Sequence, residues 1–139
     1  MPETLVRLRS HLILTAAAHF QPDMLLVDKK PQGLRNELKE TLNYLRQHRP
    51  QTRRVLLLRD ILDIPAVTIQ QRQTNNYNQL TEQHYDQIWV AGEPEIFNLP
   101  AEYNFPLALQ QKVRFCGYLN RVCGRTPRPL LREQLGVRP

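Results

Sequence analysis

The stretch Met24-Leu25-Leu26-Val27-Asp28-Lys29-Lys30-Pro31-Gln32-Gly33 decides the fold class of this chain. Four apolar residues between two aspartates are typical of a strand that is buried on both faces, as in a parallel sheet. The polar residues that follow include proline and glycine, so they predict a turn. A second apolar run, residues 55–58, also ends in charge, at Arg59-Asp60. Two buried strands of this kind favour an α/β protein.

Apolar residues at helical spacing surround these two strands. A stripe at three- and four-residue spacing, closed by Pro22, predicts a helix over residues 3–20. A second stripe predicts a helix over residues 34–48, and Pro65 at a first helical position begins a polar helix over residues 66–84. We place that polar helix on the surface, or against something absent from this chain. The first stripe consists of Leu5, Leu8, Leu12, Ala16 and Phe20, and the second of Leu34, Leu38, Leu42 and Leu45.

Two further strands are predicted, at residues 87–92 and 113–116. Between them, residues 93–106 contain three prolines and read as a long loop with at most a short helix. Strands and helices therefore alternate, which predicts a Rossmann-like parallel sheet of about four strands with flanking helices. We expect residues 1–120 to form this domain and residues 121–139 to form a basic, Pro/Arg-rich connector or tail, with a short helix near residues 130–135.

The chain has 139 residues, about the size of one domain, and its 19 Lys and Arg against 13 Asp and Glu give a net charge of +6. Four of these six charges fall within residues 121–139, so the basic composition is weak evidence for a nucleic-acid partner. No apolar run approaches the roughly 20 residues that span a bilayer, and no secretory signal is visible. Two cysteines suit a reducing compartment, so we expect a cytoplasmic location, with peripheral membrane contact as a further option. The tail arginines are Arg121, Arg125, Arg128, Arg132 and Arg138.

Parallel sheets place their working residues at the carboxyl ends of the strands. A carboxylate there could orient a sugar hydroxyl or a general base, and a lysine could bind a phosphate. The alternatives stay open: Asp28 caps its own turn beside a solvated Lys29, Arg59 and Asp60 form an ion pair or a helix start, and Gly33 supplies an unusual backbone angle. The candidate cleft residues are Asp28, Lys29, Gly33, Arg59, Asp60, Gly92 and Glu93.

No catalytic residue, metal site or cofactor motif stands out in the sequence. Cys116 and Cys123 lack the paired spacing of a zinc site, so we expect a buried strand thiol and a tail thiol. All four histidines fall within or at the ends of predicted helices, where surface roles are commoner than catalysis.

Five strings occur in the order found in a group of bacterial predicted glycosyltransferases, and the chain resembles that group over residues 5–135. The group is similar to the family that contains the lipid II-forming N-acetylglucosaminyltransferase. The strings are FQPDMLLVDKKPQG (residues 20–33), NEL (36–38), LRDILD (58–63), YDQIWVAG (85–92) and FCGYL (115–119).

The resemblance implies a GT-B enzyme, in which two Rossmann-like domains face each other across a cleft. The N-terminal domain of such an enzyme binds the acceptor, and the C-terminal domain binds the nucleotide-sugar donor. This chain matches the later part of the N-terminal domain, so the first strand with its glycine-rich loop is expected before Met1 and the donor domain after Val137. It departs from the pattern at Asn36, where glycine is expected.

The leading functional hypothesis is therefore an incomplete glycosyltransferase: an acceptor-side domain, inactive alone, whose acceptor is a small molecule or a lipid-linked sugar. The donor would bind to a missing C-terminal domain or a partner chain, and no cofactor is expected within this chain. One alternative is a non-catalytic partner subunit of a split glycosyltransferase. The least favoured is a binder of anionic surfaces or nucleic acid through the arginine-rich tail.

Overall fold

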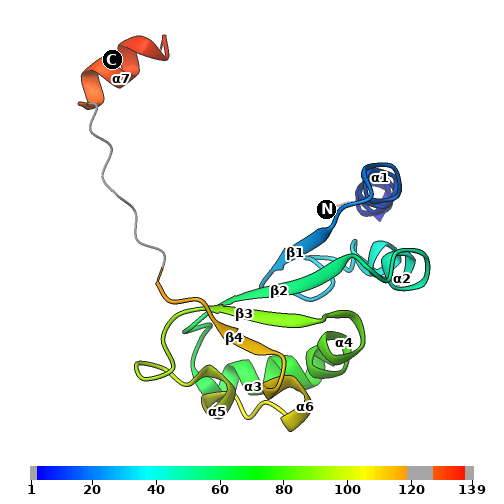
Figure 1. Ribbon diagram of the computed structural model, residues 1–139, viewed down its shortest axis with the longest axis vertical. Coiled ribbons are helices and arrows are strands. Elements are labelled where there is room, and N and C mark those ends of the chain that lie inside the picture. Colours follow the sequence, from blue (N-terminus) through cyan, green and yellow to red (C-terminus); the bar gives the residue numbers. More distant parts are fainter. Residues whose placement is uncertain (1–2, 119–126, 137–139) are drawn as a thin grey trace.

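The computed structural model of the chain describes residues 3–118 and 127–136. At its centre lies a four-stranded sheet in which every pairing is parallel and the order is β1-β2-β3-β4 (Figure 1). The predicted α/β class with a Rossmann-like parallel sheet is thus confirmed. The strands are β1 (Met24–Asp28), β2 (Arg53–Arg59), β3 (Gln87–Ala91) and β4 (Val113–Phe115).

Helices precede, connect and follow the strands (Figure 1). None that the structure describes is both long and apolar enough to cross a membrane. The short helix expected near residues 130–135 is present as α7, whereas Arg121, Cys123, Arg125 and Arg138 lie outside the described residues. The helices are α1 (Glu3–Phe20), α2 (Lys39–His48), α3 (Pro65–Thr74), α4 (Tyr77–His84), α5 (Leu99–Glu102), α6 (Leu107–Gln110) and α7 (Arg128–Gln134).

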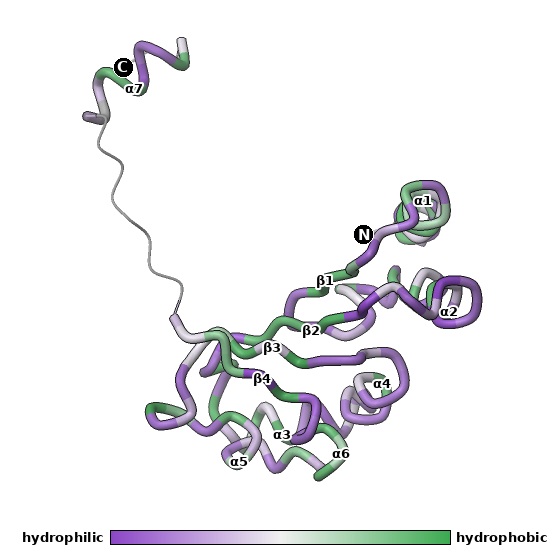
Figure 2. The backbone as a smooth tube through the Cα atoms, in the orientation of Figure 1, coloured by the Kyte–Doolittle hydropathy of each residue, from purple (hydrophilic) through white to green (hydrophobic). Residues whose placement is uncertain are grey.

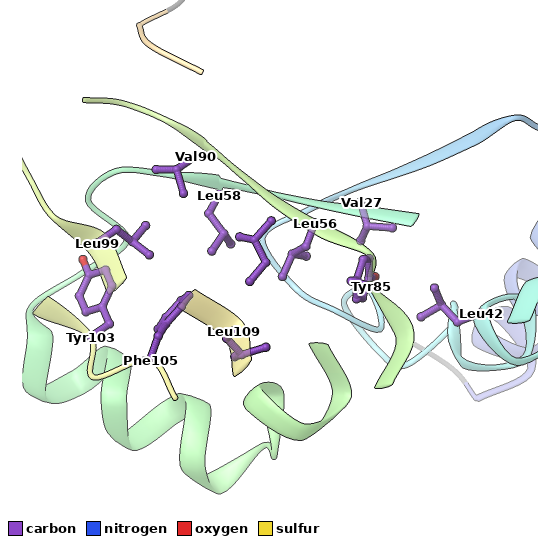
Figure 3. Packing of buried hydrophobic residues seen from close by; sticks show 11 residues of the cluster. Val27, Leu42, Leu56, Leu58, Tyr85, Val90, Leu99, Tyr103, Phe105 and Leu109 are labelled. Carbon is purple, nitrogen blue, oxygen red and sulfur yellow. The ribbon is translucent and has the colours of Figure 1, made fainter. Parts of the chain in front are cut away.

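The hydrophobic core lies on one face of the sheet. Parallel register aligns Val27, Leu56 and Ile88 across three strands, and all three are buried. Figure 3 shows the strand side chains opposite residues of the α5–α6 segment, including Tyr103 and Phe105. Figure 2 shows the hydrophobic stretch of β2 with hydrophilic residues at both ends, the pattern expected of a central strand.

The prediction that both first strands are buried on both faces is right for β2 and wrong for β1. Val55, Leu56 and Leu58 in β2 are fully buried, whereas Met24 and Leu26 in β1 are 41% and 48% exposed. The reason is position, because β2 has a neighbour on each side, whereas β1 is at the edge of the sheet that the described residues form and pairs there with β2 alone.

Helix α1 has the predicted bounds, but the apolar stripe that predicted it is exposed. Leu8 is 53% exposed, Leu12 61% and Phe20 81%. Helix α1 lies next to α2 (Figure 1), and Ala17 of α1 is buried. Periodicity therefore identified the helix without identifying the face that packs.

Two predicted helices differ from the observed ones because of residues with positive φ. Helix α2 begins at Lys39 rather than at residue 34, since Gly33 (φ 82°) and Asn36 (φ 62°) form turns before it. The polar helix is two helices, α3 and α4, which are separated at Asn76 with φ 53°. Asparagine adopts this left-handed conformation more readily than most residues, so it ends one helix and allows a second to begin.

Two smaller expectations concern the region before and after β4. The loop predicted over residues 93–106 contains one helical turn, α5, and a second turn, α6, follows it. Cys116 follows the last residue of β4 and is exposed, so the prediction of a buried strand thiol is wrong.

Candidate functional site

The carboxyl ends of β1 and β2 bring three of the predicted residues together. Asp28, Lys29 and Arg59 line a small recess of about 100 Å³ with Ile61 and Leu62. Lys29 has a left-handed backbone (φ 61°), and its N–H donates to the Leu57 carbonyl over 2.9 Å. Parallel pairing of the two strands is the cause of this grouping, because it places both strand ends at the same edge.

Asp60 belongs to a second group, at the carboxyl ends of β2, β3 and β4. The Tyr118 hydroxyl donates to Asp60 Oδ2 over 2.6 Å, and the Ile61 N–H donates to Oδ1 over 2.7 Å. These two bonds, the first above all, hold the pKa of Asp60 below its usual value. The same bond raises the pKa of Tyr118. Asp60 is therefore a fixed, ionised acceptor.

Gly92 and Glu93 lie in this second group as well. A Cβ on Gly92 would be 2.5 Å from the Asp60 Cβ, so glycine allows the β3 end to approach Asp60 closely. Glu93 is exposed, and its Oε1 would be 3.0 Å from a Cβ on Gly117. Gly92 and Gly117 are thus explained by packing, because a larger side chain at either position would crowd its neighbour. Glu93 is at the surface.

Gly33 has a structural role away from these groups. Its φ of 82° supplies the unusual backbone angle considered above, and a Cβ there would be 2.9 Å from Glu37 Cδ. The buried Glu37 binds Arg9 of α1 over 2.9 Å and accepts the Arg35 N–H over 2.6 Å. Burial raises the pKa of Glu37, but the N–H groups of Arg35 and Glu37 and the Arg9 charge lower it more, so the pKa lies below its usual value.

A pocket of about 840 Å³ lies beside the carboxyl ends of β1 and β2. Its walls are the β1–α2 loop, the β2–α3 loop and the helices α3 and α4. Its lining is strongly polar and contains more cations than carboxylates. The amide side chains are Gln32, Asn36, Gln71, Asn75, Asn76, Gln79 and Gln83, the cations are Lys29, Lys30, Arg35 and Arg72, and the carboxylate is Asp63.

One face of α3 forms a wall of the pocket. Thr68, Gln71, Arg72 and Asn75 line it at spacings of three and four residues, which place them on the same side of a helix. Thr68 and Arg72 are 5% and 4% exposed. In the described part of the chain, Thr68 Oγ1 and Arg72 Nη2 are buried without a hydrogen-bond partner.

Arg72 is held in place by two contacts on its other sides. Its Nε donates to Asn78 Oδ1 over 2.8 Å, and its guanidinium lies 4.3 Å from the centre of the Phe105 ring. Burial lowers the pKa of Arg72 to about 10, with a smaller opposing effect of Tyr77. The side chain therefore remains a cation at neutral pH.

Two buried tyrosines fix the loops that form the other walls. The Tyr103 hydroxyl accepts the Leu62 N–H over 2.9 Å and donates to the Asp63 carbonyl over 3.0 Å, which holds the β2–α3 loop. The Tyr85 hydroxyl donates to the Pro31 carbonyl in the β1–α2 loop, and burial raises the pKa of Tyr85. Both loops are thus attached to the hydrophobic core.

Sequence reasoning missed Asp63, Thr68, Arg72 and the amide side chains of the pocket. The available signal was the polar composition of residues 70–83, which left open a role against something absent from the chain. The two helices of this segment meet the β1–α2 loop only in the tertiary structure. Of the predicted residues, Lys29 lines both the recess and the large pocket, and Gly33 lines the large pocket.

The described residues, 3–118 and 127–136, contain no group of three His, Cys, Asp or Glu side chains placed to hold a metal ion. Comparison of the chain with models of known protein families, with curated proteins and with solved structures finds no match in any of the three. The geometry of the pocket is therefore the main ground on which a function can be argued.

Proposed function

We propose that this chain is the acceptor-side domain of a glycosyltransferase and that the large pocket binds the sugar acceptor. The observation that supports the proposal is the polar pocket of about 840 Å³ beside the carboxyl ends of β1 and β2. Ligand sites of parallel sheets lie at these ends, and pockets of roughly 300–1,000 Å³ suit small ligands. The GT-B arrangement, with the donor on a second domain or chain, is part of the same proposal.

The lining of the pocket matches the chemistry of sugar hydroxyls. Each hydroxyl both donates and accepts hydrogen bonds, and an amide side chain offers both an N–H donor and a carbonyl acceptor. Gln71 of α3, Asn75 directly after α3 and Gln79 of α4 line one cavity. Such a wall can bind several hydroxyls of one sugar at once.

Asp63 is the residue we assign as the general base. Among the described residues that line the pocket, Asp63 alone has a carboxylate. The Ile64 N–H donates to its Oδ1 over 2.8 Å, which orients the group. In the transfer, the acceptor oxygen bonds to the anomeric carbon while the bond from that carbon to the donor phosphate breaks. The hydroxyl proton goes to Asp63, and the nucleoside diphosphate leaves with the bonding electron pair.

Binding of neutral sugars tests the acceptor site directly. The ¹⁵N-labelled chain would be titrated with mono- and disaccharides and followed by NMR. We expect side-chain amide shifts at Gln71 and Gln79, and binding at least fivefold weaker in the variant Gln71→Ala/Gln79→Ala. The matched control, Gln70→Ala/Gln73→Ala, changes exposed residues of α3 outside the pocket and should bind as the unmodified chain does.

Two results would count against the proposal. NMR shifts confined to residues outside the pocket, or equal losses of sugar affinity in both double variants, would contradict a sugar site in this pocket. Robust sugar transfer from a nucleotide sugar by this chain alone would contradict the placement of the donor-binding site on another domain or chain. With a separately expressed donor-binding chain, the split-enzyme alternative predicts turnover only in the mixture.

A further inference from the structure

We infer that the ligand of the large pocket is phosphorylated, with the phosphate bound by the cations that line it. This inference rests on the proposed function and specifies the class of acceptor as a sugar phosphate. The observation that supports it most is the buried Arg72, which lines the cavity without an anionic partner among the described residues. Three further cations line the same cavity.

The charge of the lining is unbalanced. Lys29, Lys30, Arg35 and Arg72 line the pocket, and Asp63 is the carboxylate among the described lining residues. A phosphate monoester has up to two negative charges and three acceptor oxygens, and a carboxylate has one charge and two oxygens. The surplus of cations therefore fits a phosphate better than a carboxylate.

Arg72 is the most informative of the four cations. A buried charge is costly unless an opposite charge or hydrogen bonds compensate it. The ion pairs of the described residues do not include Arg72, and its contacts to Asn78 and Phe105 are both to uncharged groups. Its Nη2 is a donor without a partner, as is the Thr68 hydroxyl one turn earlier on the same face of α3. Both atoms are closed to solvent in this structure, so a phosphate oxygen would satisfy them only after the two side chains turn toward the cavity.

The β1–α2 loop supplies the other three cations on a preformed backbone. Gly33 and the left-handed Lys29 shape this loop, and contacts to Tyr85 and Glu37 hold it. Lys29 and Arg35 are exposed and Lys30 is half-buried, so these side chains can move toward a ligand while their backbone stays fixed. The loop and α3 would then bind the phosphate from opposite walls, next to the amides that bind the sugar hydroxyls.

The test compares glucose 1-phosphate, glucose and inorganic phosphate as probes in calorimetric titrations. We expect glucose 1-phosphate to bind at least tenfold more tightly than either of the other two probes. Its affinity should fall as the salt concentration increases, because charge contributes to binding. The variant Lys30→Gln/Arg35→Gln should lose at least fivefold in affinity for glucose 1-phosphate. Its control, Lys39→Gln/Arg46→Gln, removes the same charge from exposed residues of α2 outside the pocket and should lose none.

Arg72→Lys tests the buried cation, because lysine keeps the charge but not the planar set of donors. We expect at least a tenfold loss for glucose 1-phosphate and little change for glucose. Should this variant fail to fold, as its NMR spectrum would show, the loop variant still decides the question.

Each contrary result has a distinct meaning. Glucose bound in the pocket as tightly as glucose 1-phosphate would overturn the phosphate site and leave the proposed function standing. Inorganic phosphate bound as tightly as glucose 1-phosphate would overturn the sugar phosphate as ligand. Equal losses of affinity in the loop variant and its control would contradict the assignment of phosphate binding to the cations of the loop. Failure of all three probes to bind would count against both proposals.

Discussion

His84, the last residue of α4, shows how burial changes the chemistry of a single side chain. It is 6% exposed, and its Nδ1 has no hydrogen-bond partner in the described part of the chain. Burial, and to a lesser extent the charges of Arg46 and Arg54, lower its pKa below 6.5. The folded protein therefore keeps the imidazole neutral at a pH where the unfolded chain binds a proton.

This difference predicts a pH dependence of stability. Because the unfolded state binds more protons between the two pKa values, the free energy of unfolding rises with pH in that window. The contribution of His84 is fully present above about pH 6.5 and is lost as the pH falls through the lowered pKa. Urea unfolding at a series of pH values measures it.

The variant His84→Gln should show a flatter profile than the unmodified protein on the acid side. His48→Gln, at an exposed position of α2, is the control and should leave the profile unchanged. If the two variants have the same profile, His84 does not titrate differently in the folded and unfolded states.

At the scale of elements, the site depends on how core side chains hold the loops between strands and helices. Tyr103 is 1% exposed and makes hydrogen bonds to the backbone on both sides of the Leu62–Asp63 peptide. Phenylalanine at this position would keep the ring in the core and leave those backbone groups without the hydroxyl. The β2–α3 loop would then lose its attachment while the sheet remains.

We therefore predict that Tyr103→Phe lowers the free energy of unfolding by about 0.5–1.5 kcal/mol, the usual net contribution of a hydrogen bond, because the bonds to Leu62 and Asp63 are partly buried. It should also weaken sugar binding, because Asp63 belongs to the same loop. Chemical denaturation and the NMR titration measure the two effects. Tyr44→Phe, at a half-buried position of α2, serves as control for stability, and an equal loss there would contradict the role given to Tyr103.

At the scale of the whole molecule, the described chain has one well-packed region and one open side. The core joins the sheet to the segment from α2 to α6, whereas α1 contacts α2 and exposes its apolar stripe (Figure 1). In β1, the first strand in the sheet order, Met24 and Leu26 are exposed as well.

Paired leucine substitutions should reveal this difference. Leu42→Ala removes a fully buried side chain and should cost about 2–5 kcal/mol of unfolding free energy. Leu12→Ala changes a side chain that is 61% exposed and should shift stability by no more than about 0.5 kcal/mol. Urea denaturation of both variants measures the contrast. A large loss in Leu12→Ala would mean that the apolar stripe of α1 is packed rather than exposed.

Much of the fold was predictable because its signals are local. Apolar runs such as residues 55–58 specify buried strands, and helical spacing with proline punctuation specifies α1 and the start of α3 at Pro65. The carboxyl-end residues could also be found, since parallel strands necessarily place Asp28 and Arg59 at the same edge. The break at Asn76 and the late start of α2 were missed, because they depend on single residues with positive φ.

By itself, the sequence determined the strand and helix types, their alternation and the edge of the sheet where charged residues gather. Only the tertiary structure decided which face of α1 packs, which strand is exposed, and which polar residues surround a pocket. Helical periodicity is the same whichever face is covered, and burial depends on neighbours distant in the chain. The pocket joins Lys30 to Arg72, residues from separate elements whose proximity no local pattern encodes.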